Sequence, residues 1–88
     1  MKIRRILYSS RFERALKALN PDLKDIVDER TGMFRANCFD PRLKTHKLHG
    51  KLSEYWSFSL TYSHRVLFQF IDHETAVFID VGGHAIYQ

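Results

Sequence analysis

The feature that most constrains the fold is a change of hydrophobic periodicity about halfway along the chain. From Trp56 to Val81, large apolar side chains recur at every second position, which is typical of β-strands with one buried face. Two short polar stretches, 62–64 and 72–75, divide this region into three segments. Three strands in a meander are the simplest structure that places all the large side chains on one face. The positions of this apolar parity are Trp56, Phe58, Leu60, Val66, Phe68, Phe70, Val77, Ile79 and Val81.

The register of the meander follows from the same pattern, because a slip of one residue would turn every large side chain to the other face. The pattern predicts a three-residue loop at 62–64. The expected opposed pairs are Trp56 with Phe70, Phe58 with Phe68, Leu60 with Val66, Phe70 with Val77, Phe68 with Ile79, and Val66 with Val81. The resulting apolar face needs a cover, which only the first 40 residues can provide.

The N-terminal part of the chain has a helical period after one short apolar segment. Residues 3–8 predict a first strand. Ser10 and Glu13 have the spacing of a capping box, which predicts a helix that begins there. Asn20 before Pro21 predicts the start of a second helix, with Gly32 as a weak point or early end. The buried stripe of this helix is expected at Leu23, Ile26, Val27 and Met33 or Phe34.

These segments predict one α+β domain over residues 1–88, in the order β-α-α-β-β-β, with a helical hairpin packed on one face of a twisted, mainly antiparallel sheet. A hydrophobic content of 44% is too high for a disordered chain. The longest apolar runs have four residues, whereas a membrane span needs about 20. No signal peptide is recognisable, so we expect a cytoplasmic protein without a membrane partner. Cys38 is the single cysteine and is expected to be a reduced, structural thiol.

Charge is distributed unevenly along the chain. Residues 1–53 contain thirteen Lys and Arg against six Asp and Glu, whereas residues 54–88 contain Arg65 alone against four acidic residues. A basic half of this kind favours a polyanion or an acidic protein as partner. A solvated helix surface rich in Lys and Arg explains part of the excess equally well.

The parity that faces away from the helices is polar and could carry chemistry. The register predicts Arg65 opposite Gly82, with His84 one diagonal step away. An arginine offers forked donors to a phosphate, and a histidine exchanges a proton near neutral pH. Both residues also have plain structural interpretations, since Arg65 could pair with Asp80 and His84 could end a strand. The members of this parity are Ser57, Ser59, Thr61, Arg65, Gln69, Asp80 and His84.

The other candidate residues give weaker signals. His46 and His49 are three residues apart, but no third ligand has a recognisable spacing, so neither a metal nor another cofactor is expected. His73 lies in a tight turn and is expected to be exposed. Tyr87 near the end of the chain is of a type that more often packs than reacts.

Three motifs together resemble the RelE/ParE toxin superfamily, and most of all its RelE/StbE and YafQ-like mRNA interferases. They are Leu-x-Gly-x-Leu at 48–52 before an aromatic strand, Arg-Val-Leu-Phe at 65–68, and Gly-x-His-x-x-Tyr at the C-terminus, within a strand, helical hairpin and meander in the same order. The resemblance implies a RelE-like fold and an endoribonuclease that cuts mRNA, usually on the ribosome. It also implies an inhibiting antitoxin protein, with a homodimer or a toxin–antitoxin hetero-oligomer as possible assemblies.

The resemblance also implies roles for particular residues. His46 would be the general base, Arg65 would stabilise the phosphate, His84 would be the general acid, and Tyr87 would orient the nucleotide or support acid chemistry. Ser57 and Ser59 stand where other members carry lysines, so a lysine-driven mechanism is not expected. The residues expected to contact RNA are Arg42, Lys44, Lys47, Lys51, Ser57 and Ser59.

Two other functions remain open from the sequence. One is a ParE-like toxin that inhibits DNA gyrase without cutting nucleic acid, although that branch generally lacks the histidine-based site. The other is a catalytically inactive relative whose main activity is to bind its antitoxin.

Overall fold

The computed structural model describes residues 1–87, without the side chain of His84. The strands are β1 (Arg5–Tyr8), β2 (His46–Lys47), β3 (Trp56–Ser59), β4 (Arg65–Asp72) and β5 (Thr75–Gly82). The helices are α1 (Ser10–Ala18) and α2 (Pro21–Ala36), with short 3-10 turns η1 (Pro41–Leu43), η2 (Gly50–Leu52) and η3 (His84–Tyr87). The fold is the predicted α+β arrangement.

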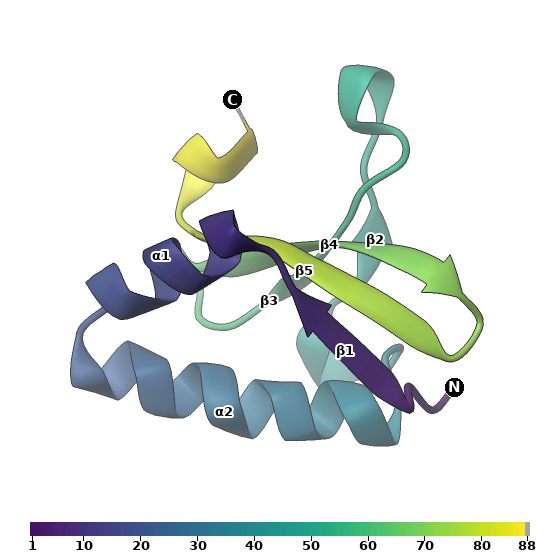
Figure 1. Cartoon of the computed structure of the whole chain (residues 1–88), viewed down its shortest axis with the longest axis horizontal. Coiled ribbons are helices and arrows are strands. Elements are labelled where there is room, and N and C mark those ends of the chain that lie inside the picture. The colour runs from purple at the N-terminus through teal and green to yellow at the C-terminus, as the bar shows by residue number, and fades with distance from the viewer. Residues whose placement is uncertain (88) are drawn as a thin grey trace.

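The strands form one mixed sheet in the order β1-β5-β4-β3-β2. β1 is parallel to β5, and all other neighbours are antiparallel. α2 runs along one face, whereas η3 and the segment that carries η2 rise from the opposite face (Figure 1). We call these the helix-covered face and the open face. The predicted order lacked β2, which is a two-residue edge strand in the basic loop.

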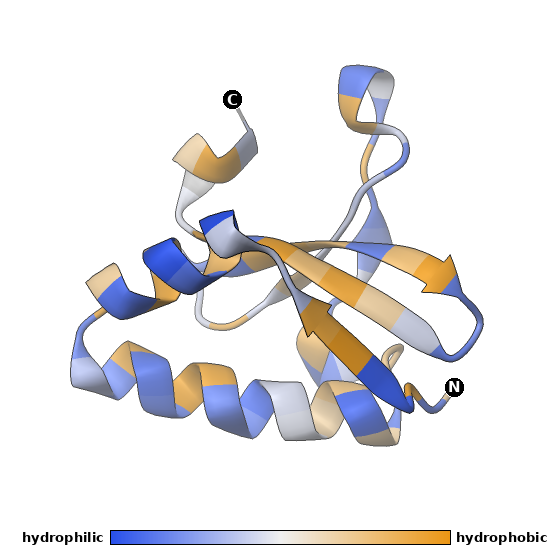
Figure 2. Cartoon of the chain, in the orientation of Figure 1, coloured by the Kyte–Doolittle hydropathy of each residue, from blue (hydrophilic) through white to orange (hydrophobic). Residues whose placement is uncertain are grey.

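The core lies between α2 and the helix-covered face. Phe34 of α2 is fully buried, and its ring centroid lies 5.0 Å from that of Phe58, 4.9 Å from Phe68 and 5.3 Å from Phe78. Edge-to-face and offset ring pairs each add about 0.5–1.5 kcal/mol to the stabilisation from burial. α2 does not end at Gly32 but continues to Ala36, and this continuation places Phe34 at the aromatic centre of the core. Apolar segments gather along β1, β4 and β5 and alternate with polar ones along α2 (Figure 2).

The predicted register between β3 and β4 is wrong by two residues, while the predicted faces are correct. Trp56 pairs with Phe68, and Phe58 pairs with Val66. A shift of two preserves the parity of every side chain. The cause is a longer loop at 60–64, in which the carbonyl of His64 accepts hydrogen bonds from the backbone of Leu60, at 2.9 Å, and of the next residue.

The predicted faces of β5 are wrong for its central residues. Leu67 pairs with Asp80 and Phe68 with Phe78, so Ile79 is an extra residue in β5. A bulge of this kind reverses the parity beyond it. The core therefore takes Ala76 and Phe78 in place of Val77 and Ile79, together with Val81.

The hydroxyl of Ser9, between β1 and α1, stabilises the bulge in β5. Ser9 donates its side-chain hydrogen bond to the carbonyl of Ile79 at 2.8 Å and accepts one from the backbone of Phe12 at 3.0 Å. Ser9, and not the predicted Ser10, is therefore the N-cap of α1, and Glu13 lies one position too late for a capping box. Only Ser9 reaches both the helix start and β5.

Candidate functional site

The open face carries a row of residues that crosses four strands. His46 of β2 pairs with Ser57 of β3, Ser57 pairs with Leu67 of β4, and Leu67 pairs with Asp80 of β5. Directly opposed residues of antiparallel strands share a face. Ser57 is fully buried, and its Oγ lies 2.8 Å from the hydroxyl of Tyr87, which η3 brings over the sheet. Three predicted site residues, His46, Ser57 and Tyr87, thus meet in this row.

A second row lies two residues along the strands. It consists of Ser59, Arg65 and Gly82, and the predicted pairing of Arg65 with Gly82 is confirmed. Arg65 Nη1 donates a long hydrogen bond to Ser59 Oγ at 3.4 Å. His84 begins η3, two residues after Gly82, but the predicted proximity of its side chain to Arg65 lies outside the described residues.

The ion pair between Arg65 and Asp80 that the sequence left open is not formed. Asp80 pairs with Arg11 of α1, with 2.8 Å between Arg11 Nη2 and Asp80 Oδ2, and its other oxygen accepts a hydrogen bond from the backbone of Val81. Within residues 1–87, no carboxylate forms an ion pair with Arg65. The guanidinium of Arg65 is therefore available to an anion.

The geometry of His46 suits a proton acceptor. Its side chain is exposed, and Nδ1 lies 2.9 Å from the carbonyl oxygen of Lys44. Because a carbonyl only accepts hydrogen bonds, Nδ1 is the donor and carries the hydrogen. In this tautomer Nε2 carries the lone pair and faces solvent, and it is the atom that a general base would use.

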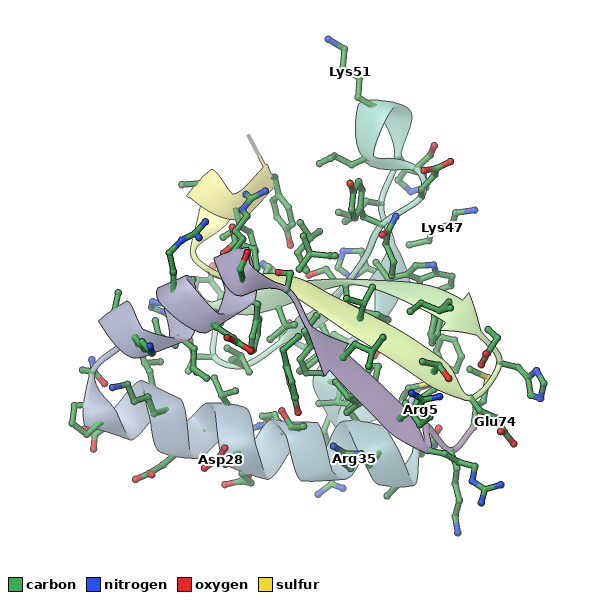
Figure 3. The ribbon with its side chains drawn as sticks, viewed as in Figure 1. Arg5, Asp28, Arg35, Lys47, Lys51 and Glu74 are labelled. Atoms are coloured by element: carbon green, nitrogen blue, oxygen red, sulfur yellow. The ribbon has the colours of Figure 1, made fainter. Side chains whose placement is uncertain are left out.

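The basic residues expected to contact RNA do not form a single cluster. Arg42 donates to both oxygens of Asp40, at 3.1 and 2.8 Å, and these hydrogen bonds lower the pKa of Asp40 to about 2. Lys47 is opposite Trp56 in β2, on the other parity from His46. Lys51 lies on η2 and points away from the sheet (Figure 3).

A cavity of about 430 Å³ at the end of β3 brings Arg42, Lys44, Ser59 and Arg65 together with residues that the sequence analysis missed. The missed lining residues are Arg30, Leu60 and Tyr62, whereas Thr61 belongs to the predicted polar parity. Arg30 had a recognisable signal, since it interrupts the apolar stripe of α2 between Val27 and Phe34. Tyr62 had none, because an aromatic in a polar loop occurs in many contexts.

Cys38 is buried and has a structural role. Burial raises the pKa of the Cys38 thiol, which disfavours the thiolate needed by a nucleophile. Among the described side chains, which do not include that of His84, no group of three metal-ligating side chains is found. No helix within residues 1–87 has the length and apolarity to cross a membrane.

No family model matches the sequence, and no curated protein matches it. Solved structures do match. YafQ from E. coli superposes with a TM-score of 0.77 at 15% identity, over 93% of this chain and 94% of that one. The chain has the RelE/YafQ-like toxin fold. A YoeB/ParE toxin from Agrobacterium tumefaciens superposes with a TM-score of 0.76 at 16% identity, over 96% of this chain and 99% of that one. The RelBE2 toxin–antitoxin complex from Mycobacterium tuberculosis gives a TM-score of 0.72 at 23% identity, over 97% of this chain and 95% of the matched chain.

Proposed function

We propose that the protein is the toxin of a toxin–antitoxin pair and acts as an endoribonuclease on mRNA, with the ribosome presenting the substrate. The observation that carries the proposal is the open-face arrangement: the exposed His46 imidazole in register with the Ser57–Tyr87 hydroxyl pair, one row from the Arg65 guanidinium. Its fold is shared with the toxin structures described above.

The arrangement suits cleavage through the neighbouring 2′-hydroxyl. His46 Nε2 takes the 2′-hydroxyl proton, and the oxygen attacks the adjacent phosphorus while the bond to the 5′-oxygen breaks. Arg65 stabilises the negative charge that grows on the phosphorane oxygens. His84 donates a proton to the leaving 5′-oxygen, and the products are a 2′,3′-cyclic phosphate and a 5′-hydroxyl. The hydroxyl of Tyr87, held by Ser57, orients the ribose.

RNA binding in this proposal relies on dispersed cations. Lys47 on β2 and Lys51 on η2 are both exposed and lie on the segment that also carries His46. Contacts of this kind weaken as salt rises, because each phosphate that is neutralised releases counterions. We assign both lysines to the RNA or ribosome backbone around the cut site.

The proposed protein partner is an antitoxin. YafQ was crystallised in a DinJ–YafQ toxin–antitoxin complex, to which this chain is similar at a TM-score of 0.75 and 16% identity. We assign the same kind of partner to this chain, and its binding would suppress the ribonuclease.

The proposal is tested by mapping mRNA ends in a translating extract that receives the wild-type chain, the variant His84→Ala or the variant His73→Ala. His73 is an exposed histidine in the turn between β4 and β5 and serves as the matched control. We expect new ends in phase with codons for the wild type and His73→Ala, and a loss of about 10²-fold or more for His84→Ala.

One result would overturn the proposed mechanism, and another would overturn the proposed function. Cutting that persists in His84→Ala would remove the assigned acid. Toxicity without new RNA ends, accompanied by a supercoiling defect, would favour inhibition of DNA gyrase.

A further inference from the structure

Arg30 occupies an unusual place in α2. It lies three residues after Val27 and four before Phe34, both of which are buried, so it belongs to the stripe that faces the sheet. Its Nε atom is buried and makes no hydrogen bond within the described residues. The closest ionic contact is weak, with 3.9 Å between Nε and Glu29 Oε1. A buried, unsatisfied donor is costly unless a ligand completes it.

Arg30 lines the cavity at the end of β3 together with three other cations. Arg42 is already neutralised by its two hydrogen bonds to Asp40. Lys44 and Arg65 have no carboxylate partner within residues 1–87. The cavity therefore keeps an excess of positive charge, contributed by α2, the loop before β2 and the start of β4.

The rim of the cavity carries an aromatic ring in a fixed loop. Tyr62 is 99% exposed. The loop around it is held by Thr61, whose hydroxyl accepts hydrogen bonds from the backbone of Ser63 at 3.3 Å and of His64 at 3.2 Å. Full exposure of a large aromatic side chain stabilises nothing within the chain, whereas bases of single-stranded RNA stack on such rings.

We infer that this cavity is a nucleotide subsite of the RNA substrate, next to the bond that is cut. It binds a backbone phosphate among Arg30, Lys44 and Arg65, and the adjoining base stacks on Tyr62. The inference rests on the proposed function and adds to it, because it extends the substrate contact from the open face to the end of β3. Arg65 is shared by both places, so the subsite adjoins the position of the reacting phosphate.

The carboxylates of an acidic protein segment would fit the charge but make no use of the ring. A carboxylate side chain satisfies a guanidinium as well as a phosphate does, but it gains nothing from an exposed tyrosine. The combination of cations, hydroxyls and a free aromatic face is typical of single-strand RNA recognition. RNA is therefore the occupant that accounts for both halves of the cavity.

The test measures binding of a fluorescent five-nucleotide RNA whose 2′-hydroxyls are methylated, so that it cannot be cut. We expect Tyr62→Ala to weaken binding about tenfold through the lost stacking. We expect Arg30→Gln to weaken it about tenfold and to reduce the salt slope of log affinity by about 0.7. Arg35→Gln is the matched control, since it removes the same charge from an exposed position of the same helix, outside the cavity.

The outcomes separate this inference from the proposed function. If Tyr62→Ala and Arg30→Gln bind RNA as tightly as the wild type does, and the wild type cuts mRNA, the subsite is overturned while the proposed function stands. Absence of binding by the wild type at low salt would also overturn the subsite. A hexaglutamate peptide that binds and loses affinity in Arg30→Gln, while RNA binding stays unchanged, would assign the cavity to an acidic protein segment instead. Because Tyr62 is exposed, its variant tests the inference without a risk of unfolding.

Discussion

Between the helices and the helix-covered face, five buried phenylalanine side chains form one connected cluster, whereas the open face buries the polar residues Ser57 and Asp80 beside Leu67. Burial of a polar group costs free energy unless it finds a partner. Each of these two has a partner from outside the sheet, Tyr87 for Ser57 and Arg11 for Asp80. One face therefore holds the fold, and the other orients the polar groups of the candidate site at little cost in stability.

Phe34→Ala tests the first half of this comparison and should have the largest effect. The ring is fully buried and contacts three other phenylalanines, so its loss should cost about 3–5 kcal/mol. Urea unfolding followed by circular dichroism measures the change. Tyr62→Ala serves as the control and should unfold as the wild type does. A loss below about 1 kcal/mol in Phe34→Ala would contradict the core described above.

Arg65→Gln tests the second half. We expect mRNA cutting to fall about 10²-fold, because one preorganised cation at the phosphate is lost, while the urea midpoint stays within error of the wild type. Arg65→Lys keeps the charge without the forked donors and should recover only part of the activity. A variant that unfolds early would show that Arg65 supports the sheet rather than the chemistry.

Ser9→Ala and Ser10→Ala distinguish the observed helix cap from the predicted one. Loss of the Ser9 hydroxyl removes the hydrogen bonds to Phe12 and Ile79 and should destabilise the fold by about 1–2 kcal/mol. Ser10 is exposed in the first turn, so its variant should change stability by less than about 0.5 kcal/mol. Thermal unfolding of the two proteins side by side decides, and equal losses would refute the assignment.

Gly32→Ala should stabilise the chain. Gly32 lies inside α2, and a Cβ there would meet no atom within 4 Å. Alanine reduces the entropy of the unfolded chain, which is worth about 0.4–1 kcal/mol. A higher urea midpoint with unchanged mRNA cutting would show that this helix contributes to stability independently of the open face. A lower midpoint would show strain that the geometry does not contain.

Asp40 gives the smallest effect, on a single titration. Arg42 lowers the pKa of Asp40 from 3.8 to about 2. The pair therefore contributes fully to stability when the pH is above 3.8, and the contribution is lost as the pH falls through about 2. Carbon-detected NMR of the carboxyl group follows the midpoint directly. In Arg42→Gln we expect the midpoint to rise toward 3.8. An unchanged midpoint would remove Arg42 as the cause.

Simple alternation predicted the faces of β3, where polar and apolar residues alternate strictly, and of β4, where Arg65 and Gln69 mark the polar parity on both sides of an apolar run. It failed in β5, where Val77, Phe78 and Ile79 are all apolar and no polar residue marks the bulge. The helix cap failed for a similar reason, because Ser9 and Ser10 are chemically equal and only the contact with Ile79 separates them.

The candidate site was predictable to the extent that it depends on parity. The pairing of Arg65 with Gly82 was predicted correctly because two register shifts between β4 and β5 offset each other, one between Leu67 and Phe68 and one between Phe70 and Asp72. The contact of Ser57 with Tyr87 was not predictable, since it depends on how η3 folds back over the sheet. The shared cavity of Arg30 and Arg65 depends on the placement of α2 against the end of β3, which no local pattern encodes.

The assigned base and the assigned cation are anchored very differently. Arg65 begins a strand of eight residues in the middle of the sheet, whereas His46 belongs to an edge strand of two. A shift of β2 by one residue along β3 would turn the imidazole of His46 to the helix-covered face. Displacement of this one edge strand by an inhibitor would therefore separate the proposed base from Arg65, while the other four strands keep their pairing.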